Sequence, residues 1–355
     1  MDVHQFATSL SYGDAISDEM LEIQKALRGR GLRSEIFIRH YDPRLAGRAH
    51  DFREYTRWSD PQNVVIFHFS IGSPVSRLFA RIPDRKIMIY HNITPHEFFL
   101  DTHRILTREC YKGRLEMRLF TGKVDLALGD SEFNRRELEQ AGYAPTGVLP
   151  ILMDFAKFRT PPDPLTLEIY GTGKTTLLFV GRVIPNKKFE DVIKVFYFYK
   201  KYFNANSQLI LAGDYRGMER YHGALMDLID RLALTDVHIT GHIEFPELVA
   251  FYRLADVYVS MSEHEGFGVP LLEAFHMGKP VVAFTAGAVE GTMNGGGVLV
   301  RKKDFFGTAA LIDTLLRDGK LHKAVVAGQK KVLNAYRTER VTSILMEHID
   351  RVSRK

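Results

Sequence analysis

The stretch VYVSMSEHEGFGVPLLEAFHMGKPVVAFT, residues 257–285, contains the elements that decide the fold. Its first apolar run, 257–262, has the length of a buried strand, LLEAFHMG (271–278) reads as a helix, and PVVAFT (280–285) reads as a second strand. Buried strands that alternate with helices pack as parallel neighbours, with helices on both faces of the sheet. We therefore predict a strand–helix–strand unit with a glycine-rich loop in front of the helix.

The same alternation extends over the whole chain. Helix-like stretches include 17–31, with Ser17 as the expected N-cap, and 190–203. The polar, proline-rich stretch 160–174 interrupts the series and is interpreted as a linker. We predict two doubly wound α/β domains that share a ligand site in the cleft between them. The strand-like runs are 34–40, 63–70, 86–92, 125–131, 147–152, 175–182, 207–213, 237–243, 257–262 and 280–285.

Length and composition agree with this picture and exclude several classes of protein. A chain of 355 residues is long for one core and suggests roughly two domains. A hydrophobic content of 45% excludes a mainly disordered protein. The single cysteine, Cys110, excludes an internal disulfide framework and multi-cysteine zinc or iron–sulfur sites. No apolar run is long enough to span a membrane, and the first residues do not resemble a signal peptide, so we expect a cytoplasmic protein.

The formal net charge of +5 is concentrated in one window, residues 77–123. Ten basic and five acidic residues lie there, and within 104–123 the basic residues alternate with apolar ones in a helical pattern. One interpretation is a solvated helix face. The other is a surface for an anionic membrane or a phosphate-bearing acceptor, which would make the protein peripheral on the inner face of the cell membrane. No nucleic-acid partner is predicted, because no recognition motif accompanies the charge.

One motif is a false lead. GTGKTT (171–176) suggests a phosphate-binding loop, but that loop needs a glycine where this chain has Glu168. The loop must also follow a strand, whereas this one precedes the strand-like run 175–182. We assign it to the linker.

Two other motifs carry a family resemblance. Glu265 and Glu273 stand eight positions apart in EGFGVPLLEA, where a glycine-rich loop opens a helix whose amides suit a phosphate. Gly181, Arg182 and Lys187 lie in VGRVIPNKKFEDVI, after a strand. Together with LAGD (211–214) and similar stretches, these motifs resemble retaining glycosyltransferases of the GT-B fold, glycosyltransferase family 4. The resemblance covers nearly the whole chain and is strongest from 175 to 300.

The resemblance implies a GT-B architecture of two Rossmann-like domains that face a central cleft. Residues 1–165 would form the acceptor domain and 166–335 the nucleotide-sugar donor domain. Residues 336–355 would form a helix that packs back on the first domain. The resemblance also implies a site. Its catalytic residues would be His91, Arg182, Lys187 and Glu265, and its donor-binding residues Gly13, Asp14, Gly181, His242, Ile243, Gly266, Phe267, Gly268, Val269 and Glu273.

The implied roles follow charge and position. Arg182 and Lys187 would neutralise the departing diphosphate, as cations in a closed site do. Glu265 would contact sugar hydroxyls and Glu273 the ribose, while residues 241–243 would lie near the base. Lys188 stands where the family commonly has glycine, so the two lysines could exchange roles.

The amino-terminal half offers a histidine and a glycine loop. His91 would lie beside the donor sugar, His96 is its competitor, and His68 is interpreted as a core residue. Gly13 and Asp14 would approach the donor phosphate or the acceptor, or form an ordinary N-cap turn.

The implied reaction is transfer of a hexosyl group, with mannosyl favoured, to a glycan or lipid-linked acceptor in surface polysaccharide synthesis. A GDP- or UDP-linked sugar would be the substrate, with retention of the anomeric configuration and no cofactor. No Asp-x-Asp motif occurs, so a metal that bridges the diphosphate is not predicted. The alternatives are another GT-B enzyme, inverting or phosphorylase-like, and a non-catalytic nucleotide-sugar-binding protein. A dinucleotide-dependent oxidoreductase would need a G-x-G-x-x-G after the first strand, which this chain lacks.

Overall fold

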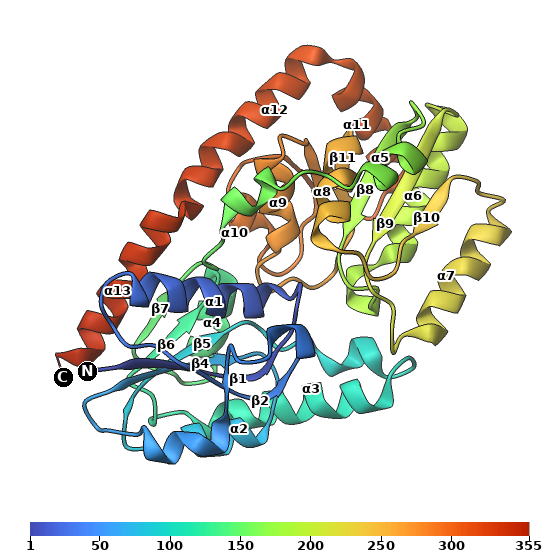
Figure 1. Cartoon of the computed structure of the whole chain (residues 1–355). Coiled ribbons are helices and arrows are strands. Elements are labelled where there is room, and N and C mark those ends of the chain that lie inside the picture. Colours follow the sequence, from blue (N-terminus) through green and yellow to red (C-terminus); the bar gives the residue numbers. More distant parts are fainter. Residues whose placement is uncertain (355) are drawn as a thin grey trace. The chain divides into compact units, whose positions relative to one another are not determined.

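The computed structural model describes residues 1–354 and divides the chain into two compact units (Figure 1). The first unit comprises Met1–Glu97, Ile105–Asp154 and the chain from Ala335 onward. The second unit comprises Phe98–Arg104 and Phe155–Asn334. Each unit holds one sheet whose named strands all pair in parallel. The predicted pair of doubly wound α/β domains is confirmed.

The sheet of the first unit has the strand order β3–β2–β1–β4–β5–β6–β7. The order reverses between β1 and β4, and ligands of such sheets bind at the carboxyl ends of the strands at that reversal. The strands are β1 (Val3–Leu10), β2 (Ile36–Tyr41), β3 (His50–Asp51), β4 (Val64–Phe69), β5 (Arg85–Tyr90), β6 (Leu126–Gly129) and β7 (Thr146–Val148). The helices are α1 (Ala15–Arg28), α2 (Pro74–Phe79), α3 (Arg104–Glu116), α4 (Glu132–Gln140) and α13 (Thr338–Ser353), with short 3-10 turns η1 (Pro43–Leu45), η2 (Phe52–Arg57), η3 (His96–Phe99) and η4 (Met117–Leu119).

The two faces of this sheet bury different side chains, because successive residues of a strand point to opposite faces. On β4, Val64 and Ile66 belong to an aliphatic cluster, whereas Phe67 and Phe69 pack in an aromatic cluster with rings from α2 and the end of η4. Figure 1 shows α1 on one side of the sheet and α2 and α3 on the other. The aliphatic side is closed by α1 and by α13, which contributes Val341, Leu345, Ile349 and Val352.

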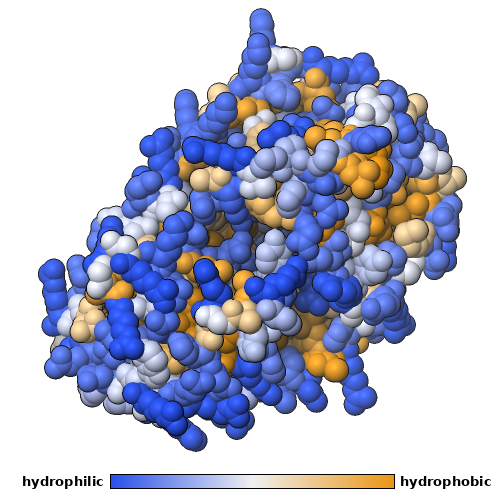
Figure 2. Space-filling view, in the orientation of Figure 1, coloured by the Kyte–Doolittle hydropathy of each residue, from blue (hydrophilic) through white to orange (hydrophobic). Residues whose placement is uncertain are grey.

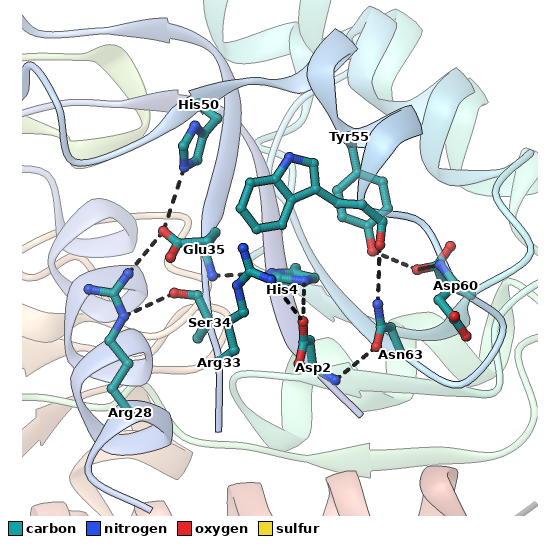
Figure 3. A network of polar contacts seen from close by, with 12 residues as sticks. Asp2, His4, Arg28, Arg33, Ser34, Glu35, His50, Tyr55, Asp60 and Asn63 are labelled. Atoms are coloured by element: carbon teal, nitrogen blue, oxygen red, sulfur yellow. Dashed lines mark hydrogen bonds and ion pairs between the residues drawn. The ribbon is translucent and has the colours of Figure 1, made fainter. Parts of the chain in front are cut away.

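A polar network ties β1 to its neighbours near the amino ends of the strands (Figure 3). The Asp2 amide donates to Asn63 Oδ1 (2.8 Å), and the Glu35 amide donates to Nδ1 of the buried His4 (3.2 Å). The Glu35 carboxylate accepts from Arg28 (2.9 Å) and lies 3.6 Å from His50 Nε2. Burial lowers the pKa of His4, so this histidine is neutral.

The second unit repeats the topology with six strands, in the order β10–β9–β8–β11–β12–β13. The strands are β8 (Thr175–Val180), β9 (Ser207–Ala212), β10 (Val237–Ile239), β11 (Val257–Ser260), β12 (Val281–Phe284) and β13 (Val298–Val300). The helices are α5 (Pro164–Tyr170), α6 (Phe189–Tyr202), α7 (Glu219–Arg231), α8 (Phe245–Leu254), α9 (Val269–His276), α10 (Val289–Met293), α11 (Phe305–Arg317) and α12 (Gly319–Val332), with η5 (Phe155–Arg159), η6 (Pro185–Lys187) and η7 (Leu333–Tyr336).

Several local features differ from the sequence-based expectations. The stretch 160–174 is not all linker, because Asp163 caps helix α5 by accepting the Thr166 amide (2.7 Å), and α5 packs on α8. The units divide after Asp154, earlier than the boundary expected at 165. The N-cap of α1 is Asp14 and not Ser17, which lies in the first turn and donates to the Asp14 carboxylate. No helix among residues 1–354 is long and apolar enough to cross a membrane.

Candidate active site

Arg182 lies just beyond the carboxyl end of β8, where the backbone is anchored on both sides. The Gly181 amide donates to Ala212 O (3.0 Å) and the Val183 amide to Asp214 O (3.0 Å), so the chain between them cannot shift freely. The Arg182 side chain is exposed, and it forms no ion pair with any residue in the described range 1–354. This guanidinium is therefore available for an external anion.

Lys187 closes the η6 turn and is held by Glu265. Its Nζ lies 2.7 Å from each oxygen of the Glu265 carboxylate, and the two side chains are 18% and 10% exposed. The lysine stem passes over Gly181, whose missing Cβ would lie 3.9 Å from Lys187 Cδ. Because a charge-assisted pair with so little solvent is strong, the structure orients both groups together.

Lys188 has a different environment from Lys187. Its backbone is left-handed (φ 52°), the conformation that suits glycine, and it stands directly before α6. Its Nζ lies 3.5 Å from Glu190 and 3.3 Å from Glu263. The structure therefore pairs Lys187, and not Lys188, with Glu265.

The loop that carries Glu265 is braced by its neighbours. Gly287 must be glycine, because a Cβ there would lie 2.3 Å from Glu265 O, and the Ala288 amide donates to that same oxygen (2.9 Å). Thr292 Oγ1 donates to Phe267 O (2.6 Å). Asn186, which the sequence analysis missed, accepts the Glu263 amide (2.9 Å) with its backbone oxygen and donates from Nδ2 to His264 O (3.2 Å). Loop and lysine turn are thus one rigid piece.

Residues 266–269 bring the chain into helix α9. Gly268 is the N-cap residue of α9 with φ 93°, and Val269 is the first helical residue. No side chain caps this end, but Pro270 has no amide hydrogen and the Leu271 amide donates to Gly268 O (3.0 Å), which leaves the Val269 amide at the start of the helix for an anion. The predicted position of the glycine-rich loop, between strand β11 and a helix, agrees with the structure.

Glu273 lies one turn into α9 and is buried. Its Oε2 accepts the hydroxyl of Tyr252 (2.9 Å), and the same hydroxyl lies 3.3 Å from Pro270 O. Burial and the Glu273 charge raise the pKa of Tyr252 far above its usual range, so the phenol remains a donor. Tyr252 on α8 is a second residue that motif reading missed.

The segment after β10 contains the residues predicted to lie near a base. Gly241 has φ 74°, and a Cβ there would approach the Tyr215 ring at 3.3 Å. His242 is exposed, with Nε2 3.6 Å from Glu244, and Ile243 is half-buried. Tyr215 stacks on His222 with ring centroids 4.0 Å apart. An aromatic residue directly after LAGD was the available signal for Tyr215.

In the first unit, Gly13 and Asp14 form the turn that opens α1. Gly13 has φ 74°, and the Asp14 carboxylate accepts the Ser17 amide (3.0 Å) and the Ser17 hydroxyl (2.9 Å). This is the N-cap geometry that the sequence analysis left open as an alternative. The Asp14 carboxylate is already used to cap the helix. The Gly13 backbone, which has no side chain, is therefore the part of this turn that a ligand could approach closely.

His91 follows β5 and is almost completely buried. Its Nε2 lies 3.0 Å from His68 Nδ1 and 3.6 Å from Glu19 Oε2, and its Nδ1 lies 3.4 Å from Asp130 Oδ2. Burial alone would lower the pKa of His91, but the two carboxylates outweigh it and raise that pKa. His96 lies elsewhere, half-buried, beside Glu97 (3.3 Å) and the Tyr111 ring.

The predicted residues therefore fall into one set in each unit. In the second unit the structure joins Lys187 to Glu265, fixes Glu273 through Tyr252, and leaves Arg182 exposed. In the first unit it surrounds His91 with Glu19, His68 and Asp130. Cations with uncapped helix amides suit a diphosphate, and fixed carboxylates suit sugar hydroxyls.

Comparisons with known proteins match part of the second unit in sequence and the whole chain in fold. Residues 174–318 match the family model described as Glycosyl transferases group 1. Glycogen synthase of Mycobacterium tuberculosis is 32% identical over 154 residues, which are 41% of this chain and 35% of that protein. The O-antigen chain mannosyltransferase B of Escherichia coli is 28% identical over 142 residues, 40% of this chain and 36% of that protein. The chain thus spans about a third of the length of these curated relatives.

A solved structure matches over the whole chain. Anabaena Alr3699/HepE in complex with UDP-glucose has a TM-score of 0.78 and 17% sequence identity, and the match covers 99% of this chain and 100% of that one. At this level of identity the likeness concerns the fold alone. The predicted GT-B fold is confirmed.

Proposed function

We propose that the chain is a retaining glycosyltransferase that moves a hexosyl group from a nucleotide diphosphate sugar to a glycan or lipid-linked acceptor. The observation that carries the proposal is the Lys187–Glu265 pair, in which one ammonium contacts both carboxylate oxygens at 2.7 Å. Both residues lie within the segment 174–318 that matches Glycosyl transferases group 1. The matched segment therefore contains the most constrained charged pair of the candidate site.

The diphosphate would be bound by positive charge and amides. Arg182 is exposed and unpaired within residues 1–354, and the first turn of α9 has no side-chain cap. Lys187 has three donors and gives two to Glu265, which leaves one for a phosphate oxygen. As the bond to the sugar breaks, negative charge grows on the diphosphate, and these fixed donors stabilise it.

The sugar and the nucleoside would be bound by the two glutamates. Glu265 offers its carboxylate to sugar hydroxyls from a loop whose backbone is braced by Ala288 and Thr292. Glu273 would accept the ribose hydroxyls with the oxygen that Tyr252 orients. The base would lie near residues 241–243.

Retention is proposed by front-face substitution, in which the departing phosphate helps to deprotonate the acceptor. Glu265 is poorly suited to act as a covalent nucleophile, because both of its oxygens are engaged by one ammonium. A carboxylate held in this way stabilises charge and position instead. No bridging metal is included, since the sequence has no Asp-x-Asp motif.

Two donor classes are proposed, GDP-mannose first and UDP-hexoses second. A mannosyl donor is supported by the similarity to the O-antigen chain mannosyltransferase B, and a UDP donor by the UDP-glucose complex of HepE. The proposed glycosyltransferase family is family 4, and the proposed process is surface polysaccharide synthesis in the cytoplasm.

The test is a screen of nucleotide sugars for thermal stabilisation and for release of the nucleoside diphosphate. We expect one donor to stabilise the chain and to be hydrolysed slowly without acceptor, and the Arg182→Ala variant to lose both effects. Arg301→Ala is the matched control, because Arg301 is exposed in the same unit and pairs with Glu290 (2.6 Å). Binding without turnover would replace the proposal by a non-catalytic binder. An inverted product anomer, or free phosphate as acceptor, would assign another GT-B activity.

We propose that α3 binds the protein to an anionic membrane surface, where a lipid-linked acceptor would be reached. The outward face of α3 carries exposed Ile105, Tyr111 and Leu115, with exposures of 62%, 50% and 48%. Arg104, Arg108 and Lys112 are exposed along the same helix. Figure 2 shows apolar and hydrophilic side chains intermixed over the lower part of the molecule, where Figure 1 places α3. An apolar stripe flanked by bases fits an interface rich in anionic lipid.

Not all of the predicted basic segment faces outward. Arg114 turns inward, where its guanidinium contacts Glu137 (2.8 Å) and Ile93 O (3.0 Å). The test is therefore sedimentation with vesicles that contain or lack anionic lipid, using Arg108→Glu/Lys112→Glu. Each base contributes about 1 kcal/mol at such a surface, so binding should fall by more than about tenfold. The exposed Lys323→Glu is the control, and equal binding of all three proteins would return α3 to a solvated helix face.

A further inference from the structure

A row of buried polar side chains crosses one face of the first sheet, from Gln5 in the first half of β1 to the carboxyl ends of β4, β5 and β6. Gln5 on β1, His68 on β4, His91 after β5 and Asp130 after β6 follow the same alternation as the aliphatic residues beneath α1. Glu19 reaches into the row from α1 and is fully buried. In a buried cluster with this many titratable side chains, the position of each proton decides which contacts attract and which repel.

The two ends of the row have fixed hydrogen positions. Gln5 Nε2 donates to Met20 O (3.0 Å), so its Oε1 faces His68 Nε2 (3.0 Å). A carbonyl oxygen can only accept, and His68 Nε2 therefore carries a hydrogen. At the other end, His91 Nδ1 lies 3.4 Å from the Asp130 carboxylate as an ion pair without a hydrogen bond, and because imidazole is a stronger base than carboxylate, we infer that this nitrogen also carries a hydrogen.

The two histidines meet nitrogen to nitrogen between these ends. His68 Nδ1 and His91 Nε2 are 3.0 Å apart, the ring planes differ by 7°, and the ring centroids are 5.2 Å apart. The difference between these two distances equals twice the distance from the centre of an imidazole ring to its nitrogen. Both nitrogens therefore lie on the line that joins the two ring centres. Two facing lone pairs would repel each other, and a proton must lie between them.

A metal ion fits this arrangement less well than a proton. The donor atoms of Glu19, His68 and His91 lie within 4.8 Å of one another, which is close enough for a common cation. Ring lone pairs that bind one metal converge on a point beside the nitrogen–nitrogen line. Here the rings are coplanar and face each other along that line, as in a shared hydrogen bond.

We propose that His68 and His91 form a buried imidazole pair that carries one positive charge, with Gln5, Glu19 and Asp130 as the residues that position its protons. Three hydrogens on four ring nitrogens give this charge. The carboxylates place the charge on the His91 side, because Glu19 Oε2 is 3.6 Å from His91 and 3.9 Å from His68. In agreement, the pKa of His91 is raised and burial lowers that of His68 well below its usual value.

Glu19 is the group that changes charge near neutrality. Its Oε1 accepts only a long bond from the Leu152 amide (3.3 Å), and its Oε2 has no hydrogen-bond donor in the described chain. Burial raises the pKa of Glu19 to about 7. The charged groups that face His91 are Asp14 and Glu19 from α1, Asp130 from the β6 end, and His68 on β4. Burial raises the pKa of Asp130, although its contact with His91 opposes this rise. With Glu19 protonated and Asp130 ionised, the charges of the imidazole pair and Asp130 balance each other, and ionised Glu19 adds one negative charge.

The use of this charge rests on the proposed function and on the family resemblance, which implies that His91 lies beside the donor sugar. His91 Nε2 is engaged by His68, and Nδ1, which makes no hydrogen bond within the described residues, is buried 3.4 Å from the Asp130 carboxylate, so neither ring nitrogen is exposed to a sugar hydroxyl. The contribution of His91 is then its fixed position and its charge. His68, Glu19 and Gln5 are accordingly positioning residues for that charge.

The test is nitrogen-15 NMR of the full chain labelled at histidine, without any substrate. We expect both His91 nitrogens to be protonated below the Glu19 midpoint, and His91 shifts to move with a midpoint of about 7 as Glu19 ionises. Glu19→Gln should abolish that inflection and leave His91 protonated. His4 is the matched control in the same sheet, with an unprotonated Nδ1 that accepts the Glu35 amide. Resonances are assigned by their loss in His91→Gln and His4→Gln.

The outcomes of this experiment test the charged imidazole pair independently of the proposed transferase activity. A neutral His91, with one unprotonated nitrogen below pH 7, would overturn the charged pair. An inflection that persists in Glu19→Gln would overturn the role of Glu19. Because no substrate is present, the expected spectra together with a failed donor screen would retain the charged pair and reject the transferase.

Discussion

The first unit buries histidines at both ends of its sheet, and the two ends treat them in opposite ways. Near the amino ends of the strands, His4 accepts a backbone amide and contacts the rings of Phe37, Tyr55 and Trp58 edge-on. At the carboxyl ends, His91 lies among Glu19, His68 and Asp130. Burial lowers the pKa of His4, whereas carboxylates raise that of His91.

The two ends also differ in how well their buried charged groups are satisfied by hydrogen bonds. The charged groups near the amino ends either reach solvent, as Arg28 and Glu35 do, or are buried with hydrogen-bond partners, as Asp84 is with the hydroxyls of Tyr55 and Ser59. The carboxyl end keeps Glu19 fully buried with an oxygen that no donor reaches, which opposes folding. In the second unit, Lys187 and Glu265 likewise lie mostly buried beyond the strand ends. Both ends bury charge, but the buried carboxylate oxygen that lacks a donor, on Glu19, lies at the end of the sheet where such folds bind ligands.

The largest expected effect is at Arg182. Its replacement by alanine removes the exposed cation at the end of β8, and we expect kcat/KM to fall about 100-fold to 1000-fold, as for loss of one charge-stabilising donor. Steady-state kinetics with the donor found in the screen measures this. Arg301→Ala should retain full activity. An equal loss in both variants would show that Arg182, at the carboxyl end of β8, has no specific role in the reaction.

The Lys187–Glu265 pair should behave as one functional unit. Lys187→Ala and Glu265→Gln should each lower kcat/KM about 100-fold, while the double variant should lose little more than either single one. Each single change leaves a mostly buried partner without its counterion, and the second change removes that partner. Multiplied losses in the double variant would show that the two residues act independently.

Glu19→Gln should stabilise the protein at alkaline pH. The folded-state pKa of Glu19 is about 7, against 4.5 for a free carboxyl, so its favourable protonated form is fully present below pH 4.5 and lost as the pH rises through 7. The difference corresponds to about 3 kcal/mol of unfolding free energy at pH 8. Urea unfolding of both proteins at pH 4.5 and pH 8 measures it, and a constant difference between the two pH values would contradict the assignment.

The smallest expected effect is at His4. Its pKa is lowered in the folded state, so the wild-type protein should lose stability as the pH falls below about 6.5, through the folded-state pKa. His4→Gln should cost about 1 to 2 kcal/mol at neutral pH, because the Glu35 amide loses its acceptor, and it should flatten the acid limb. The kcat/KM of this variant should equal that of wild type. A strong loss of activity would contradict the purely structural role assigned to the amino end of the sheet.

The sequence predicted the fold well where patterns are local. Alternating apolar runs located the central strands of both sheets, and the glycine-rich loop before α9 lies where its motif indicated. Cap residues were less certain, because Asp14 and Ser17 both suit an N-cap and only the backbone path decides between them. Helix α5 was missed because a short helix leaves little periodic signal, and its start resembles a proline-rich linker.

Partners across the fold could not be predicted. Tyr252 and Glu273 are 21 residues apart, and Lys187 and Glu265 are 78 apart, so no spacing rule links them. Glu19 lies on the inward side of α1, where periodicity predicts burial but not which groups it will meet. Asp130 had a usable signal, since it directly follows the buried strand β6, as His91 directly follows β5.

The place of α13 determines the order in which the two units can be completed during synthesis. Val341, Leu345, Ile349 and Val352 close the aliphatic core that begins with Val3. The second unit needs nothing beyond Asn334. A ribosome therefore releases all of the second sheet before it delivers the residues that finish the first, and the part of the chain made first is the last to be sealed. Until then the aliphatic face of the nascent first sheet stays exposed, and a chaperone that binds apolar surface has its longest opportunity there.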